Sequence, residues 1–346
     1  MRLIENIIKI SVCTLLCSIS TISFSQQEDS TLVRPILLGG MKIDGAVKTK
    51  LEVSTSSGVM RFNVRNSRLG LRGDISDYFS YRIQVDLSAE GNFSPLDLFG
   101  TLKPAKDLSV NLGQTSIPFE NSYIITPAEM LFSNRAFVGK YFTPGSRDLG
   151  GVLRYQFQVA NFPLEMQAGV FNGGLINNPE WTNHPSYAFR FIAGNMDAFR
   201  TSVKVYRYQG ETLDLFLWGA DMHYRYNRFR VDSEVMNRRS FPSGDNLFGC
   251  YLQGIYTFDF GLLKMFRTFS PALRWDGMGD GAFFSGFDVS RLTIGLNFGF
   301  PLKPFDSVLR FDYEQYFTRS DNFPAFINRE PQVADNKFTI ELLLRF

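Results

Sequence analysis

Residues Ser290–Phe300 read SRLTIGLNFGF and alternate between apolar and polar side chains. The apolar members are Leu292, Ile294, Leu296, Phe298 and Phe300, whereas Arg291, Thr293 and Asn297 share the opposite face. A period of two residues indicates a β-strand. A strand of a soluble sandwich can alternate in the same way. A length of about ten residues with aromatic ends, however, matches a strand that crosses a bilayer, which needs about nine to eleven residues.

The same pattern recurs along the chain, for example in YRIQVDLS (residues 81–88) and in KFTIELLLRF (residues 337–346). Sixteen segments are candidate strands. They lie near 39–48, 59–72, 79–88, 95–102, 108–115, 149–158, 164–172, 187–194, 199–208, 213–225, 228–238, 247–260, 268–277, 289–300, 306–317 and 335–346. In the second of them the apolar phase shifts near Asn66-Ser67, which predicts a bulge.

The connections between these segments alternate in length. Short ones such as KPAKD and VANFP are separated by long ones such as GGLINNPEWTNHP and TRSDNFPAFINREPQVAD. Transmembrane barrels have short periplasmic turns and longer extracellular loops. The sequence therefore predicts an all-β fold, a transmembrane antiparallel up-and-down β-barrel of about 16 strands (16–18).

The first 25 residues have the layout of a secretory signal peptide, because Arg2 and Lys9 flank an apolar run and the small residues Ser23 and Ser25 precede Gln26. We expect a signal peptide over 1–25, a short N-terminal segment over 26–38 and the barrel over 39–346. The expected location is the outer membrane of a Gram-negative bacterium.

The composition of the chain excludes several kinds of partner and structure. Without the signal peptide the chain has 34 basic and 33 acidic residues, which gives no support for nucleic-acid binding. Cys250 is the single cysteine of the expected mature chain, so no intrachain disulfide is expected. The expected mature chain has no run of eighteen apolar residues, so no membrane-spanning helix is predicted. The chain is nevertheless rich in aromatic residues, with 35 phenylalanines. These features are typical of an outer-membrane barrel in contact with lipid.

No pattern of an enzyme or of a metal site is evident. The two histidines, His184 and His223, have no assignable nucleophile beside them, and we expect His223 to lie at the membrane interface and His184 in a solvated loop. Asp276, Asp280 and Asp288 surround a glycine-rich segment, but their spacing matches no ordered calcium loop. We therefore expect no catalytic residue, no metal and no cofactor.

In a lipid-embedded barrel the polar face of each strand lies inside, and sixteen strands enclose a lumen wide enough for water. The polar face carries arginines that would line this lumen, namely Arg61, Arg65, Arg82, Arg154, Arg190, Arg230, Arg274, Arg291 and Arg310. Two interpretations remain open. The arginines set ion selectivity, or they pair with the interspersed acidic residues and keep the wall wet.

Three segments, SRLGLRGDISDYFSYRIQVDLS, LDLFGTLKPAKDLSVNLGQTSIPFE and RDLGGVLRYQF, resemble successive signatures of the phosphate-selective porin O and P family. This family consists of outer-membrane barrels, many of them from Bacteroidetes. The resemblance covers residues 61–157 in motif detail and implies a porin, a water-filled channel for passive diffusion of small, anionic, phosphate-like solutes. Family members often have a basic residue between Gln114 and Pro118, where this chain has Thr115 and Ser116.

The long connection after the fifth strand, about residues 116–148, occupies the ordinal position at which sixteen-stranded porins fold a loop into the lumen. The resemblance implies the same here. The charges available at such a constriction are Glu120, Glu129, Arg135, Lys140, Arg147 and Asp148. An alternative function is a non-conducting barrel that anchors a cell-envelope complex. General porins of this strand number are usually trimers, which makes a homotrimer the assembly expected by analogy.

Overall fold

The computed structural model describes residues 40–89, 92–119, 121, 125, 129–261, 264–281, 286–300, 307–319 and 336–346. The expected signal peptide and the segment 26–38 lie outside the described residues. All further statements concern the unit Gly40–Phe346.

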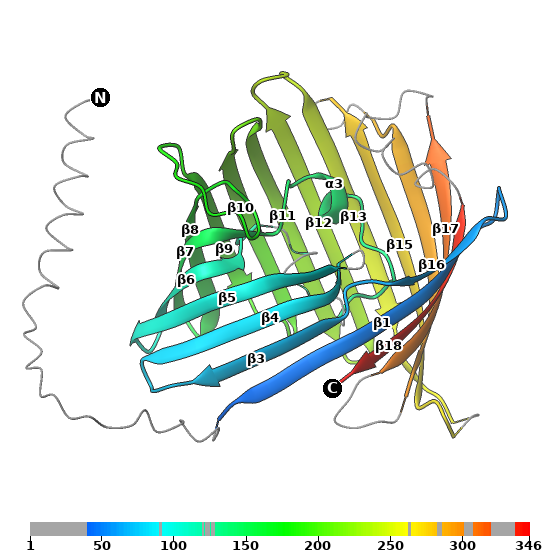
Figure 1. Cartoon of the computed structure of the whole chain (residues 1–346). Coiled ribbons are helices and arrows are strands. Elements are labelled where there is room, and N and C mark those ends of the chain that lie inside the picture. The colour runs from blue at the N-terminus through cyan, green and yellow to red at the C-terminus, as the bar shows by residue number, and fades with distance from the viewer. Residues whose placement is uncertain are drawn as a thin grey trace, which may run out of the picture. The chain divides into compact units, whose positions relative to one another are not determined.

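This unit is a β-barrel, and the described residues include the short helix α3 (Val138–Tyr141) (Figure 1). Its strands are β1 (Lys42–Ser54), β2 (Met60–Val64), β3 (Arg68–Asp74), β4 (Phe79–Ala89), β5 (Asn92–Ala105), β6 (Leu108–Ser116), β7 (Arg147–Val159), β8 (Phe162–Phe171), β9 (Ser186–Gly194), β10 (Phe199–Gln209), β11 (Asp214–Tyr226), β12 (Phe229–Ser240), β13 (Asn246–Tyr256), β14 (Phe258–Asp259), β15 (Thr268–Asp280), β16 (Val289–Gly299), β17 (Val308–Thr318) and β18 (Lys337–Arg345).

The eighteen segments form sixteen wall positions, because β2 and β3 both pair with β1, and β13 and β14 both pair with β15. All pairings are antiparallel, and β1 pairs with β18 to close the ring. The prediction of an antiparallel barrel of about 16 strands is confirmed. The interruption predicted near Asn66-Ser67 separates β2 from β3, and Asn66 has a φ of 60° there.

The two rims of the barrel differ. One, called here the short-turn rim, has tight connections such as Ala160-Asn161, where both residues have positive φ, as in a type I′ hairpin turn. The other, the long-loop rim, carries the longest connections, residues 117–146 and 319–336. The predicted alternation holds for the longest connections. It fails at 90–91 and 210–213, which are short although they lie on the long-loop rim, and at 260–267 and 300–307, which are longer than the other turns of the short-turn rim.

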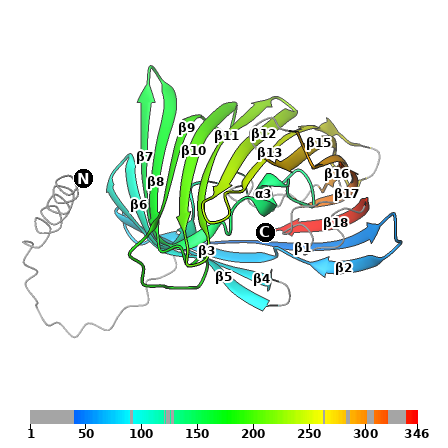
Figure 2. The same ribbon diagram turned by 90° about the horizontal axis from the view of Figure 1, so that it is seen from above.

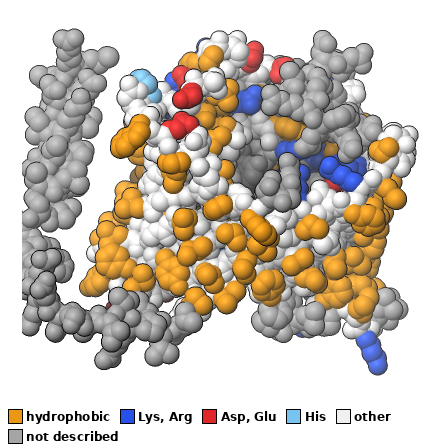
Figure 3. Space-filling view, in the orientation of Figure 1, with side chains coloured by type: hydrophobic (Ala, Val, Ile, Leu, Met, Phe, Trp, Pro, Cys, Tyr) orange, Lys and Arg blue, Asp and Glu red, His pale blue; other side chains and the backbone are white. Residues whose placement is uncertain are grey.

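The two faces of each strand have opposite chemistry. On β10, Val203 and Val205 are exposed outward, whereas Lys204 and Tyr206 are buried on the inner face. Figure 3 shows apolar side chains spread over the outer surface of the barrel and basic side chains inside its upper hollow. This arrangement is inverted relative to a soluble sandwich, and it is the arrangement that lipid contact requires.

The seam that closes the ring depends on a glycine. Gly45 exchanges backbone hydrogen bonds with Phe346, at 2.8 and 3.1 Å, and a Cβ atom at Gly45 would overlap the ring of Phe346. The seam therefore has space for an aromatic side chain at residue 346 only because residue 45 has none.

Candidate functional site

The candidate site is the loop of residues 117–146 together with the inner wall that it contacts. The Ile117 N–H donates to the Ser146 carbonyl at 3.0 Å, and Pro118 then ends the pairing because it has no N–H. Because β7 begins at Arg147, the loop is shorter at each end than the predicted 116–148. Arg147 and Asp148 belong to the strand.

Apolar side chains of the loop pack on the inner face of the barrel. Phe119, Phe137, Val138 and Phe142 are at most 2% exposed, in one cluster with wall residues such as Tyr206. Figure 2, which looks along the barrel, shows α3 inside the ring of strands. Burial of these aromatic side chains gives the loop a fixed position instead of leaving it in solvent.

The first polar anchor of the loop is Asn121. Its backbone N–H donates to the Glu234 carboxylate at 2.9 Å, and its side-chain oxygen accepts from Arg190 at 3.2 Å and from Arg200 at 2.6 Å. Both arginines also contact Asp221, at 2.8 and 2.5 Å. One asparagine thus ties the loop to β9, β10 and β12.

The second anchor is the segment 130–137, whose backbone binds charged side chains of β15, β16, β17 and β1. Its carbonyl oxygens accept hydrogen bonds from cations: Met130 from Arg310 at 2.5 Å, Ser133 from Lys48 at 2.9 Å, Asn134 from Arg274 at 2.8 Å and Arg135 from Arg291 at 2.8 Å. Its N–H groups donate to carboxylates: Ser133 to Asp312 at 2.6 Å and Phe137 to Asp276 at 2.9 Å.

Aromatic rings of the loop reinforce this anchor. The Arg274 guanidinium lies 4.7 Å from the centre of the Phe132 ring, and the Arg291 guanidinium lies 4.6 Å from that of Phe137. Cation–π contacts are strongest where the cation is removed from water, as both guanidinium groups are here. The wall charges therefore satisfy a buried stretch of loop backbone that has no secondary structure of its own to do so.

The nine predicted arginines divide between two environments. Five contact the loop or its anchors, namely Arg190, Arg230, Arg274, Arg291 and Arg310. The other four lie elsewhere on the wall. Arg61 pairs with Glu52 at 2.7 Å, Arg82 with Asp44 at 2.8 Å, and Arg154 with Glu165 at 3.1 Å, while Arg65 is half-buried between β2 and β3.

The charged residues predicted for the loop lie in different surroundings. Glu120 lies outside the described residues. Glu129 is exposed and its carbonyl accepts from Arg230 at 3.4 Å, and Lys140 lies 5.0 Å from the Tyr141 ring. The Arg135 side chain is half-buried.

The two predicted charges that lie in β7 are buried. Arg147 binds Asp97 through contacts of 2.6 and 3.4 Å, and Asp148 accepts from the Gly173 N–H at 2.8 Å. Their contacts therefore connect β7 to β5 and to the start of the β8–β9 loop.

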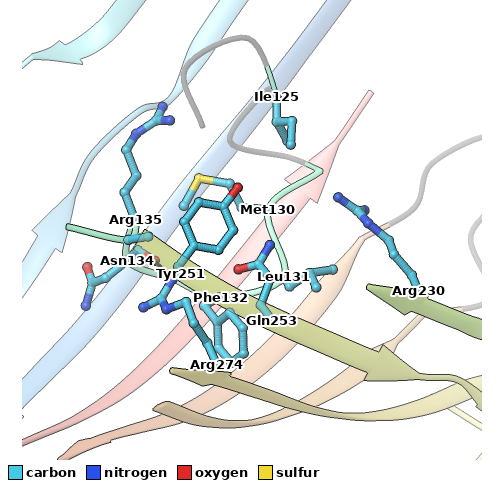
Figure 4. Close-up of a pocket in the computed structure, with 11 residues that line it drawn as sticks. Ile125, Met130, Leu131, Phe132, Asn134, Arg135, Arg230, Tyr251, Gln253 and Arg274 are labelled. Carbon is cyan, nitrogen blue, oxygen red and sulfur yellow. Dashed lines mark hydrogen bonds between the residues drawn. The ribbon is translucent and has the colours of Figure 1, made fainter. Parts of the chain in front are cut away.

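A pocket of about 30 Å³ remains between the loop and the wall. Met130, Phe132 and Arg135 line it from the loop, and Arg230, Tyr251 and Arg274 from the wall (Figure 4). It has room for about two water molecules. Its lining joins aromatic surface to three guanidinium groups at the position where the loop meets β12, β13 and β15.

Some contact residues were missed from the sequence. Asn121 and Asn134 are short polar residues in an irregular segment, and Lys48 and Lys204 share the inner parity with the arginines but are not among the predicted residues. The facing of β11, which the sequence leaves open because both parities are apolar, places Leu217 and Asp221 inside and Phe216 and Trp218 outside.

The interfacial position expected for His223 is wrong. This residue is 2% exposed on the inner face, where its ring nitrogens contact the Asp232 carboxylate at 2.5 Å and the Met196 carbonyl at 3.0 Å. The undetermined parity of β11 explains the error.

Within the described residues, no group of three or more His, Cys, Asp or Glu side chains is placed to hold a metal ion. None of the helices in this part of the chain has the length and apolar character needed to cross a membrane.

The sequence matches no family model and no curated protein. Solved structures match the fold. OmpF of Salmonella typhi, in complex with daunomycin, superposes with a TM-score of 0.64 at 15% identity, over 88% of this chain and 97% of that one. An anion-selective porin from Comamonas acidovorans gives 0.57 at 12% identity, over 88% and 98%. The trimer form of OmpT, an outer membrane protein of Vibrio cholerae, gives 0.59 at 9% identity, over 88% and 99%. The chain thus has the fold of outer-membrane porins.

Proposed function

We propose that the chain is an outer-membrane porin, a water-filled barrel through which small ionic solutes diffuse without reaction or cofactor. The observation that carries this proposal is the inversion of the barrel, with an apolar outer surface and an inner wall of charged side chains against which a long loop is held. Such a wall favours water and ions over lipid. The resemblance to the phosphate-selective porin O and P family supports the same function.

The loop of residues 117–146 is the proposed constriction. Its two anchors hold it on two parts of the inner wall, Asn121 at β9, β10 and β12, and residues 130–137 at β15–β17 and β1. These parts lie on either side of β13. We infer that the described parts of the loop, which lie against the inner face at these two places, narrow the lumen. The solute would pass between this loop and the remaining wall.

We propose that the preferred solutes are small anions such as phosphate. Two ion pairs of the wall present their cation to solvent more than their carboxylate. The Arg61 side chain is 47% exposed and its partner Glu52 is 4% exposed, and Arg154 is 45% exposed against 20% for Glu165. The anion-selective porin among the structural neighbours supports this preference. By analogy with the trimer form of OmpT, the proposed assembly is a homotrimer in lipid.

Conductance tests the proposal. Purified, folded protein in a planar bilayer should open in discrete steps. In a gradient of potassium chloride the reversal potential should lie closer to the equilibrium potential of chloride than to that of the cation. When phosphate replaces chloride, it should lie closer to the equilibrium potential of phosphate. A reversal potential on the cation side would contradict the anion preference while leaving the pore intact.

The second candidate function is a non-conducting barrel that anchors an envelope complex. It is favoured by the extent to which the loop covers the wall, since Arg190, Arg274 and Asp276 are all at most 2% exposed. Folded protein that inserts but gives no conductance steps would select this function over the porin.

A further inference from the structure

The outer surface of the barrel carries charged residues near the long-loop rim, where its other outward side chains are mostly apolar. On β10, Arg207 follows the outward residues Val203 and Val205. Arg239 has the corresponding position on β12, and Asp214 lies between them at the start of β11.

These residues lie at one level of the wall. Arg207 is opposite Phe216 in the β10–β11 pairing, and Phe216 is opposite Arg239 in the β11–β12 pairing. On the other side, Arg207 is opposite Tyr187 of β9. The row Tyr187, Arg207, Phe216 and Arg239 therefore alternates between aromatic and cationic side chains over four neighbouring strands.

Phe241, in the connection after β12, joins the two arginines. The guanidinium carbon of Arg207 lies 4.1 Å from its ring centre, and that of Arg239 lies 5.6 Å away. Stacking on one ring restricts both long side chains and holds two cations together on the surface.

The row lies near the edge of the apolar band on the side of the long-loop rim, from which a long arginine side chain can reach the lipid head groups. Arg207 follows Phe199, the first residue of β10 at the short-turn rim, by eight positions. A strand rises about 3.3 Å per residue and is tilted by about 35–45° in such barrels, so the row is about 20 Å from that rim along the barrel axis. The apolar band of such barrels is about 25 Å tall and is bounded by aromatic residues. Tyr187 and Phe216 of the row, and Trp218 two residues further along β11, are exposed aromatic residues at this level.

The two arginines differ in their partners. Asp214 binds Arg207 through two contacts of 2.6 and 2.7 Å. Arg239 is exposed, and in the described part of the chain no carboxylate forms a salt bridge with it. A guanidinium group matches a phosphate through two parallel hydrogen bonds, and basic sites at the membrane boundary bind phosphate-bearing head groups.

We propose that Arg239 and Arg207, stacked on Phe241, bind a phosphate of a lipid head group in the leaflet at the long-loop rim. Arg239 is the principal ligand, Arg207 is the second, and Tyr187 and Phe216 contact the adjoining acyl region. The inference rests on the outer-membrane location in the proposed function but not on conduction, since the site is on the opposite face of the strands from the lumen.

The test is lipid binding by folded full-length protein in detergent, followed by native mass spectrometry. The probes are a lipid A that carries two phosphates and the same lipid with both phosphates removed. The variant Arg239→Gln/Arg207→Gln/Asp214→Asn removes both cations. It also removes the Asp214 carboxylate, which would otherwise lose its partner Arg207. We expect it to bind the phosphorylated lipid about tenfold more weakly, a loss of about 1.4 kcal/mol. Wild-type protein should prefer the phosphorylated lipid.

A matched control is Arg154→Gln/Glu165→Gln, which removes an arginine–carboxylate pair from the inner face. It should bind the phosphorylated lipid as wild type does. Equal binding of both lipids by wild type, unchanged binding by the outer-face variant, or an equal loss in the control would each overturn the proposal. Displacement of the lipid by millimolar inorganic phosphate would show a free-anion site and would also overturn it. Conductance of the outer-face variant should equal that of wild type, which separates this outcome from a failure of the porin function.

Discussion

Two groups of arginines on the same inner wall have different surroundings. Arg274 and Arg291 are at most 3% exposed, bind carbonyl oxygens of the loop and stack on its phenylalanines. Arg61 and Arg154 have nearly half of their side chains exposed and one carboxylate partner each. The first group binds a buried part of the loop, whereas the second is exposed to solvent. The comparison teaches that a lumen arginine is not by itself a selectivity residue, because its role depends on whether the loop covers it.

The largest expected effect comes from removing what the first group holds. Replacement of residues 119–143 by a short Gly/Ser connection should raise single-channel conductance and reduce ion selectivity, because the segment proposed to narrow the lumen is gone. Planar-bilayer recordings measure both quantities. Removal of residues 242–244, in a connection at the same rim that lies beside the outward arginines, is the control and should leave conductance unchanged. A folded barrel that lacks 119–143 but conducts as before would mean that the loop does not form the constriction.

Arg291→Gln should have the next largest effect. Arg291 contacts Asp276 at 2.7 Å and Glu314 at 3.1 Å. The substitution removes the nearest cation from both of these buried carboxylates. Loss of one partner of a buried ion pair costs about 3–5 kcal/mol of unfolding free energy. Urea unfolding in detergent micelles measures this loss, and noise in the open-channel current reports loosening of the loop. The double variant Arg291→Gln/Asp276→Asn should recover part of the stability. If Arg291→Gln alone unfolds like wild type, Arg291 does not hold the loop.

Arg154→Gln should have the smallest effect on stability. An exposed ion pair contributes about 1 kcal/mol or less to folding. The same change removes a cation from the inner wall, so the reversal potential should move toward the equilibrium potential of the cation. This shift should be smaller at high salt because of screening. The conservative variant Arg154→Lys should keep the wild-type reversal potential. A stability loss as large as that of Arg291→Gln would erase the distinction between the two groups.

Most of the fold could be predicted from the sequence, because alternation is a local property. Each of the sixteen predicted segments coincides with one wall position, and even the phase shift at Asn66 corresponds to a real interruption. The prediction left one strand undetermined, β11, whose two parities are both apolar. There Leu215 and Leu217 are buried on the inner face while Phe216 and Trp218 face outward. The part of the inner wall that an apolar loop covers can itself be apolar. There, the polarity of a side chain does not show whether it faces the lumen or the lipid.

The site could be predicted only in part. The sequence placed arginines on the inner parity because a charged side chain on the outer face of a strand is costly in lipid. It could not separate Arg291 from Arg154, because both lie on the inner parity of an alternating strand and the strand sequence does not indicate which of them the loop covers. It also gave no reason to select Asn121, whose importance comes from three wall strands that are far away in the chain.

By itself, the sequence of this protein therefore determined the barrel, its approximate strand number, the rim that carries the long loops and the charged character of the inner wall. These follow from side-chain alternation and from turn composition, which are properties of neighbouring residues. Only the tertiary structure decided which charges hold the loop, which remain accessible to a solute and which, like Arg207 and Arg239, meet on the outer surface. The physical reason is that burial and ion pairing depend on contacts between strands and loops that are distant in sequence, and such contacts leave no periodic signal.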